Sequence, residues 1–153
     1  MKALSVWQPW ASAIALGIKR IETRGRRINH LGELAICASK KRSGEIEMLW
    51  RNLYMDHPDV MLAFFKKAKR GCDYTALPFG CVVAVVQVSV HGSIEFWSDS
   101  VSETDRALGD FSKGRFVMGL SKVRRVKNPV PVIGRQGLFN LPAEVEAQVR
   151  AQL

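Results

Sequence analysis

The sequence lacks the features of membrane-embedded and disulfide-stabilised proteins. Its longest apolar run, 81–86, is far shorter than the roughly 18 residues of a membrane-spanning helix and is typical of a buried strand. No apolar segment of signal-peptide length precedes Gln8. The cysteines are odd in number: Cys37 and Cys81 lie in apolar strand-like segments and Cys72 in a loop. We therefore expect free thiols, the first two buried, in a cytoplasmic protein without a membrane partner.

Motifs for metals and common cofactors are also missing. His30, His57 and His91 are far apart and form no metal-ligand spacing with the cysteines. The sequence contains no glycine-rich phosphate loop, no serine-centred nucleophile elbow and no His-Glu-x-x-His pattern. We predict neither a metal site nor a cofactor.

Positive charge is abundant and unevenly distributed. The formal net charge is +9, and the basic residues concentrate in 1–42 and 113–153, whereas 81–112 is acidic. If the two basic regions meet in space, they form a positive face that attracts phosphate groups. The pattern favours nucleic acid or a phosphorylated ligand, and a solvated basic surface that aids solubility is the alternative.

The hydrophobic periodicity predicts a single α+β domain, 1–153, built on a small β-barrel with helices. Pro9 suits the first turn of a helix and Gly17 its end, while Pro58 divides a longer helical stretch into two helices. The predicted strands are 2–6, 18–24, 33–39, 80–91 and 115–126, with an extended segment at 128–132 and a turn at 134–137. The predicted helices are 9–16, 43–69 and 141–153, with one or two helical turns within 101–108.

Four blocks give the chain a resemblance to a known family: SVWQPWA at 5–11, GIKRIETR at 17–24, LAICASKK at 34–41, and PVPV with GRQGLF within 129–139. In this order they resemble the ASCH family of the PUA-like superfamily. The resemblance implies a PUA-like small β-barrel with helices, in which 43–70 is a helical insertion. It also implies a cleft between the first helix and the strands that takes RNA or a nucleotide-like ligand.

Some members of the family are amidohydrolases that deacetylate acetylcytidine, and ribonuclease activity on single-stranded RNA has been attributed to others. The amidohydrolase pattern is Gly-x-Lys-x-x-Thr-x-Arg, which Gly17, Lys19 and Arg24 match. Glu22 stands in place of the threonine, and the sequence identifies no counterpart of a further catalytic glutamate. The amidohydrolase mechanism therefore does not carry over intact.

Lys19 and Glu22 are the candidate catalytic residues. A desolvated Lys19 would act as a base, whereas a charged Lys19 would clamp a phosphate. Glu22 would pair with Lys19 or Arg24, or accept a hydrogen bond from a base. A surface lysine and a plain structural ion pair are the alternatives.

The candidate ligand-binding residues combine aromatic, amide and basic side chains: Gln8, Trp10, Arg24, Ser39, Lys40, Arg135 and Gln136. Trp7 and Trp10 offer stacking surfaces for a base, although we expect at least one of them in the core. Gln8 either reads a base edge or braces its turn. Ser39 and Lys40 are expected at the same cleft, which Arg135 and Gln136 would close.

Two charged groups stay ambiguous. Basic side chains on the last long strand are either phosphate contacts or a solvated face: Lys122, Arg124, Arg125 and Lys127. A loose acidic group is interpreted as a solvated flap: Asp99, Glu103, Asp105 and Asp110.

Three functional hypotheses follow. The first is a binding module whose basic cleft takes RNA or a modified base. The second is an enzyme in the same cleft, either an amidohydrolase on a modified nucleoside or a single-strand ribonuclease. The third is a protein-interaction module that uses the helices at 43–70.

Overall fold

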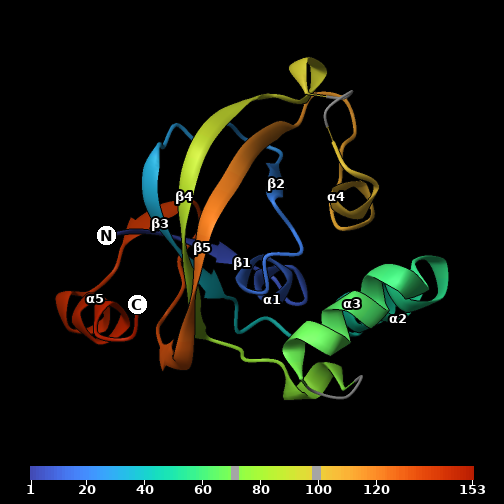
Figure 1. The fold of residues 1–153 in the computed structure, drawn as a ribbon. Helices are drawn as coiled ribbons and strands as arrows, with labels where there is room; N and C mark the ends of the chain where they lie inside the picture. Colours follow the sequence, from blue (N-terminus) through green and yellow to red (C-terminus); the bar gives the residue numbers. More distant parts are fainter. Residues whose placement is uncertain (70–72, 98–100) are drawn as a thin grey trace.

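One curled six-stranded sheet organises the chain (Figure 1). The computed structural model describes residues 1–69, 73–97 and 101–153. The strand order is β2-β5-β4-β3-β1-β6, and every neighbouring pair is antiparallel except β1 and β3, which are parallel. The strands are β1 (Lys2–Val6), β2 (Ile21–Arg24), β3 (Gly32–Ala38), β4 (Cys81–Ser93), β5 (Phe116–Pro131) and β6 (Leu138–Asn140). The helices are α1 (Trp10–Ala15), α2 (Gly44–Asp56), α3 (Pro58–Ala68), α4 (Glu103–Ala107) and α5 (Ala143–Arg150), with 3₁₀ turns η1 (Tyr74–Ala76) and η2 (Ile94–Phe96).

The sheet curls into a half-barrel because its two longest strands bend together. The β4–β5 ladder shifts register at three points, and each shift increases the local twist. Lys122 in β5 has φ of 46°, in the left-handed region that such irregularities use. The mixed α+β architecture agrees with the predicted fold class.

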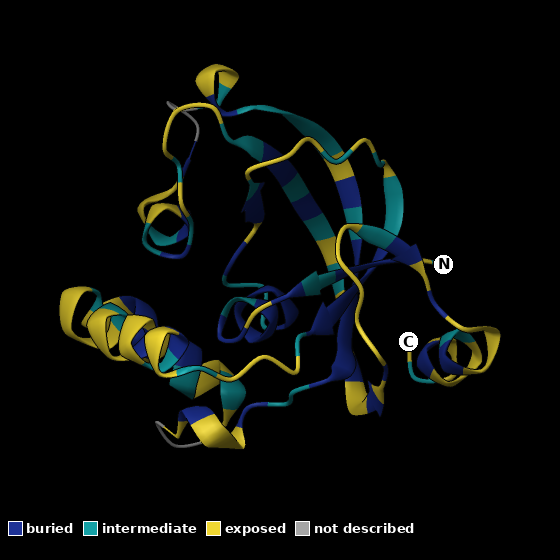
Figure 2. Ribbon diagram, turned by 180° about the vertical axis from the view of Figure 1, so that it is seen from behind, coloured by how far each residue is buried: buried dark blue, intermediate teal, exposed yellow. Residues whose placement is uncertain are grey.

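Helices cover both faces of the curled sheet. Buried side chains of one face, such as Leu34, Ile36 and Val86, pack with Ile14 of α1. On the other face, alternate residues of the same strands pack with Val149 of α5. Figure 2 shows buried residues alternating with less buried ones along the strands. The first helix is thereby fixed against the sheet, and Trp10 at its start is its one residue that is not buried.

The stretch 43–69 forms the two predicted helices. Ser43 caps α2 by accepting a hydrogen bond from the Ile46 amide, and Pro58 begins α3. The hairpin has its own core, in which Trp50 meets Phe64 edge-on with 5.3 Å between ring centroids. This core continues to Ala13 of α1, so the hairpin borders the first helix.

Three strand predictions required correction. The second strand begins at Ile21 rather than at residue 18, because the amides of Ile18 and Lys19 donate to the Ala13 carbonyl of α1. Residues 116–131 form a single strand, whereas the pattern had separated 115–126 from 128–132. The short β6, which pairs with β1, had not been predicted.

The described cysteines agree with the expectation of buried free thiols. Burial raises the pKa of Cys37 to about 12 and that of Cys81 to about 11. Cys72, predicted in a loop, lies outside the described residues. Within the described ranges, no helix is long and apolar enough to cross a membrane, and no group of three or more His, Cys, Asp or Glu side chains is arranged to hold a metal ion.

Candidate functional site

A cleft of about 660 Å³ opens where the start of α1, strand β2, helix α2 and the segment after α4 meet. Its lining includes Trp7 and Trp10 beside α1, Leu49 of α2, and Leu108 after α4. The charged side chains of the lining are Lys19, Glu22, Arg24, Asp110 and Arg115. A volume of this size lies within the range of small-molecule sites in proteins.

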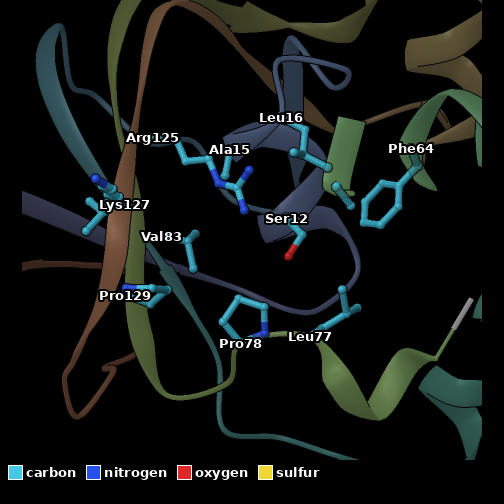
Figure 3. Close-up of a pocket in the computed structure, with 12 residues that line it drawn as sticks. Ser12, Ala15, Leu16, Phe64, Leu77, Pro78, Val83, Arg125, Lys127 and Pro129 are labelled. Atoms are coloured by element: carbon cyan, nitrogen blue, oxygen red, sulfur yellow. The ribbon is translucent and has the colours of Figure 1, made fainter. Parts of the chain in front are cut away.

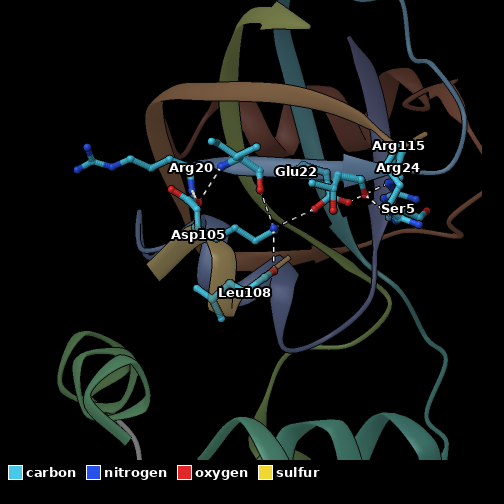
Figure 4. A network of polar contacts seen from close by, with 10 residues as sticks. Ser5, Arg20, Glu22, Arg24, Asp105, Leu108 and Arg115 are labelled. Atoms are coloured by element: carbon cyan, nitrogen blue, oxygen red, sulfur yellow. Dashed lines mark hydrogen bonds and ion pairs between the residues drawn. The ribbon is translucent and has the colours of Figure 1, made fainter. Parts of the chain in front are cut away.

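Lys19 lines the cleft from its interior side, and only 1% of the residue is exposed. Its Nζ donates to the carbonyl oxygens of Ile21 at 2.6 Å and Leu108 at 2.8 Å (Figure 4). It also forms an ion pair with Glu22, with 3.7 Å between Nζ and Oε2. Nζ is therefore held by two carbonyl oxygens and lies next to a carboxylate. The side chain is built into the protein and is not a surface lysine.

The environment of Lys19 acts on its pKa in two opposing ways. Burial lowers the pKa of the ammonium group below its ordinary 10.5, because desolvation disfavours the charged state. The carboxylates of Glu22 and Asp105 partly offset this effect. A lysine with a lowered pKa beside a carboxylate is a common arrangement for proton transfer.

Glu22 and Arg24 extend the network along β2. Their positions two residues apart on a strand place both side chains on the same face. Glu22 is 6% exposed, and its Oε1 accepts a hydrogen bond from Arg24 Nε at 2.8 Å. Arg24 Nη2 donates to the Ser5 carbonyl at 2.6 Å, which joins β2 to β1. Arg24 is thus both a wall of the cleft and a connection between strands.

Asp105 is a buried anchor, which corrects its interpretation as part of a solvated flap. It is 5% exposed, and its Oδ1 accepts from the backbone amides of Arg20 at 2.7 Å and Ile21 at 3.0 Å. Ser102 caps α4 by accepting from the Asp105 amide, and its hydroxyl donates to Asp105 Oδ2. The Ser-x-x-Asp pattern at 102–105 was a sequence signal for this cap. Asp99, of the same acidic group, lies outside the described residues.

The two tryptophans at the start of α1 both line the cleft. Trp7 is 42% exposed, with Lys41 Nζ 4.0 Å from the centroid of its ring. Trp10 is half-buried and packs against two core clusters. Trp10 thus packs against the core as expected of one tryptophan but is not fully buried, and both indoles line the cleft.

Arg115 is a site residue that the sequence interpretation missed. It precedes β5, pairs with Asp110 at 3.1 Å, and donates to the Thr23 carbonyl at 3.5 Å. Arg115 lies near Arg24 of the cleft because β2 and β5 pair in antiparallel fashion, with Arg24 opposite Phe116. Because β2 and β5 are far apart in the chain, no local pattern connects them.

Several candidate ligand-binding residues lie outside the described lining of this cleft. Gln8 is completely buried: its amide group donates to the Pro78 carbonyl at 2.6 Å and accepts from the Ser12 amide at 3.1 Å, so it braces the turn. Ser39 accepts from the Lys41 amide, and Lys40 is exposed. Arg135 and Gln136 are exposed in the turn before β6.

The block at 17–24, which supplies three charged residues of the cleft, lies within a match to a known family. The family model of the ASCH domain matches residues 4–129. The chain belongs to the ASCH family. No curated protein matches its sequence. The family match thus includes Lys19, Glu22 and Arg24 of the cleft.

Solved structures show the same ASCH fold. The crystal structure of ASCH from Zymomonas mobilis is 17% identical, covers 98% of this chain and 93% of its own, and has a TM-score of 0.55. The structures of two point mutants of that protein are also 17% identical and cover 98% of this chain, with TM-scores of 0.54 and 0.55. They cover 96% and 94% of their own chains. At this identity the likeness concerns the fold alone.

Proposed function

We propose that the ASCH cleft binds a base or nucleotide of single-stranded RNA. The observation that carries the proposal is the meeting of Trp7, Trp10 and Arg115 at a cleft of about 660 Å³. Aromatic rings stack on any base, and such stacking contributes about 1–3 kcal/mol per base. The three cations and two carboxylates of the lining leave an excess of one positive charge, which suits a phosphate diester.

The geometry modifies the expected roles of the basic residues. Lys19 is buried and its Nζ is held by two carbonyl oxygens, so we assign no phosphate to it. Arg24 and Arg115 each use two nitrogens within the protein, but the partner of Arg115 Nη1 is the exposed carboxylate of Asp110, which a phosphate can replace. We therefore assign the base to the tryptophans and the phosphate mainly to Arg115.

Trp7→Ala is expected to weaken binding of nucleoside monophosphates and of single-stranded RNA by about 5- to 100-fold, the equivalent of one lost stacking contact. Isothermal titration calorimetry measures the first ligand and fluorescence anisotropy the second. Phe96→Ala is the matched control, because Phe96 is 87% exposed and lies outside the described lining of the cleft. Equal affinities of the two variants would contradict the proposal. Wild-type protein that binds neither ligand would favour the protein-interaction hypothesis.

The second candidate function is an enzyme in the same cleft, and the Lys19–Glu22 pair favours it. In hydrolysis of an N-acetylated cytidine, water adds to the acetyl carbonyl while the Glu22 carboxylate takes the proton of the water. Lys19 then supplies a proton to the departing amine, which gives acetate and cytidine. The same acid–base pair would serve cleavage of single-stranded RNA. Besides Glu22, the described lining contains one carboxylate, that of Asp110.

Lys19→Met is expected to reduce product formation from acetylcytidine or single-stranded RNA by at least about 100-fold, the scale of general acid–base catalysis. Mass spectrometry of the products measures it. Arg20→Met is the matched control: it removes one neighbouring positive charge, and the Arg20 side chain extends away from the network in Figure 4. No product from the wild type, or full activity in Lys19→Met, rejects this mechanism and leaves the binding function standing.

A further inference from the structure

A second, smaller cleft lies between α1, α3, β5 and the connection that leads to β4 (Figure 3). Its volume is about 60 Å³. Ser12, Ala15 and Leu16 line it, whereas Trp10 lines the main cleft. Because successive helical residues are about 100° apart, Trp10 and Ser12 point to opposite sides of α1. The first helix therefore separates two clefts.

Two cations line this smaller cleft, and a third contacts the backbone of a lining residue. Arg125 and Lys127 line it from β5, and in Figure 3 the Arg125 side chain extends towards α1. Lys67 of α3 donates from Nζ to the carbonyl of Leu16 at 3.3 Å. All three residues are exposed. Among the described residues, none of them forms an ion pair with an acidic side chain.

The neighbouring Arg124 is in a different situation. It projects to the opposite face of β5 and pairs with Glu33, which also binds Arg150. Arg124 is therefore neutralised within the protein. Arg125 and Lys127 instead face the smaller cleft and have no acidic partner among the described residues. Uncompensated cations around a small cleft indicate an anionic ligand.

We propose that this cleft holds a backbone phosphate of a single-stranded RNA whose base occupies the main cleft, an inference that rests on the proposed function. A space of about 60 Å³ takes a few water molecules or part of a phosphate group but excludes a base. Arginine and lysine are the side chains that contact nucleic-acid phosphates. The two clefts lie across one helix, whose diameter is about 10 Å, so a strand of a few nucleotides reaches both.

The test compares the double variant Arg125→Gln/Lys127→Gln with Arg124→Gln and wild type. The probe is a single-stranded RNA of about ten nucleotides, a length typical of small single-strand binders. Loss of the contacts to this one phosphate is expected to reduce the slope of log affinity against log salt concentration by about 0.7, because each neutralised phosphate of a single strand contributes about 0.7. Arg124→Gln is expected to keep the wild-type slope. Binding of nucleoside monophosphates is expected to stay unchanged in all three proteins.

The outcomes separate this proposal from the function on which it rests. If Trp7→Ala weakens RNA binding while the double variant keeps the wild-type slope, the main cleft binds RNA and the phosphate proposal is overturned. If the double variant loses affinity for inorganic phosphate without a change in the RNA slope, the cleft takes free phosphate and the proposal again fails. If the wild-type protein does not bind RNA, both the phosphate proposal and the proposed function are overturned.

Discussion

Asp105→Ala is expected to lower the free energy of unfolding by about 3–5 kcal/mol, because it leaves the amides of Arg20 and Ile21 without their acceptor. It also removes the side-chain connection between α4 and the start of β2. For a protein of this size the change corresponds to about 10 °C or more in melting temperature, measured by circular dichroism. The loss of α4 would also open the wall of the main cleft at Leu108.

Two variants distinguish the anchoring role of Asp105 from its charge. Asp105→Asn keeps an oxygen acceptor for both amides and is expected to cost about 1 kcal/mol. Glu103→Gln, which removes an exposed charge from the same helix, is expected to change stability by less than about 0.5 kcal/mol. A melting temperature of Asp105→Ala close to that of Glu103→Gln would show that the carboxylate does not anchor α4.

Glu22→Gln is expected to cost about 3 kcal/mol in the free energy of unfolding, because Lys19 loses the carboxylate that pairs with it in the interior. The same substitution in a Lys19→Met background is expected to cost much less, since the buried cation is gone. The double-mutant cycle, measured by urea denaturation, is therefore expected to give a coupling energy of about 1–3 kcal/mol. Additive effects would contradict a buried Lys19–Glu22 pair.

The pH dependence of stability tests the burial of Lys19 independently of this cycle. Urea denaturation of the wild type and of Lys19→Met at several pH values measures it. The folded protein holds the pKa of Lys19 below 10.5, so between the folded value and 10.5 the unfolded chain binds more protons. The free energy of unfolding contributed by Lys19 therefore rises with pH in this window, and Lys19→Met loses the rise. The raised pKa values of Cys37 and Cys81 act in the opposite direction, but they are common to both proteins and cancel in the difference.

The candidate site shows how far local patterns reach. Trp10, Lys19, Glu22 and Arg24 were identified because two short blocks contain them, and the structure brings them to one cleft. Gln8, from the same blocks, is instead buried with both its polar groups satisfied. A local pattern shows that a side chain is polar but does not show whether another segment provides its partner.

The sequence by itself determined the α+β class, the ASCH family, the division of the helical insertion at Pro58 and most strands, because these depend on local periodicity and on short blocks in a fixed order along the chain. Only the tertiary structure decided that Lys19 is buried, that Asp105 anchors α4, that Arg115 joins the cleft, and that Arg125 and Arg124 face different surroundings. The physical reason is that burial and ion pairing depend on contacts between segments far apart in the chain. The register of β5 against β2 and β4 sets the contacts of Arg115, Arg124 and Arg125, and no single segment encodes it.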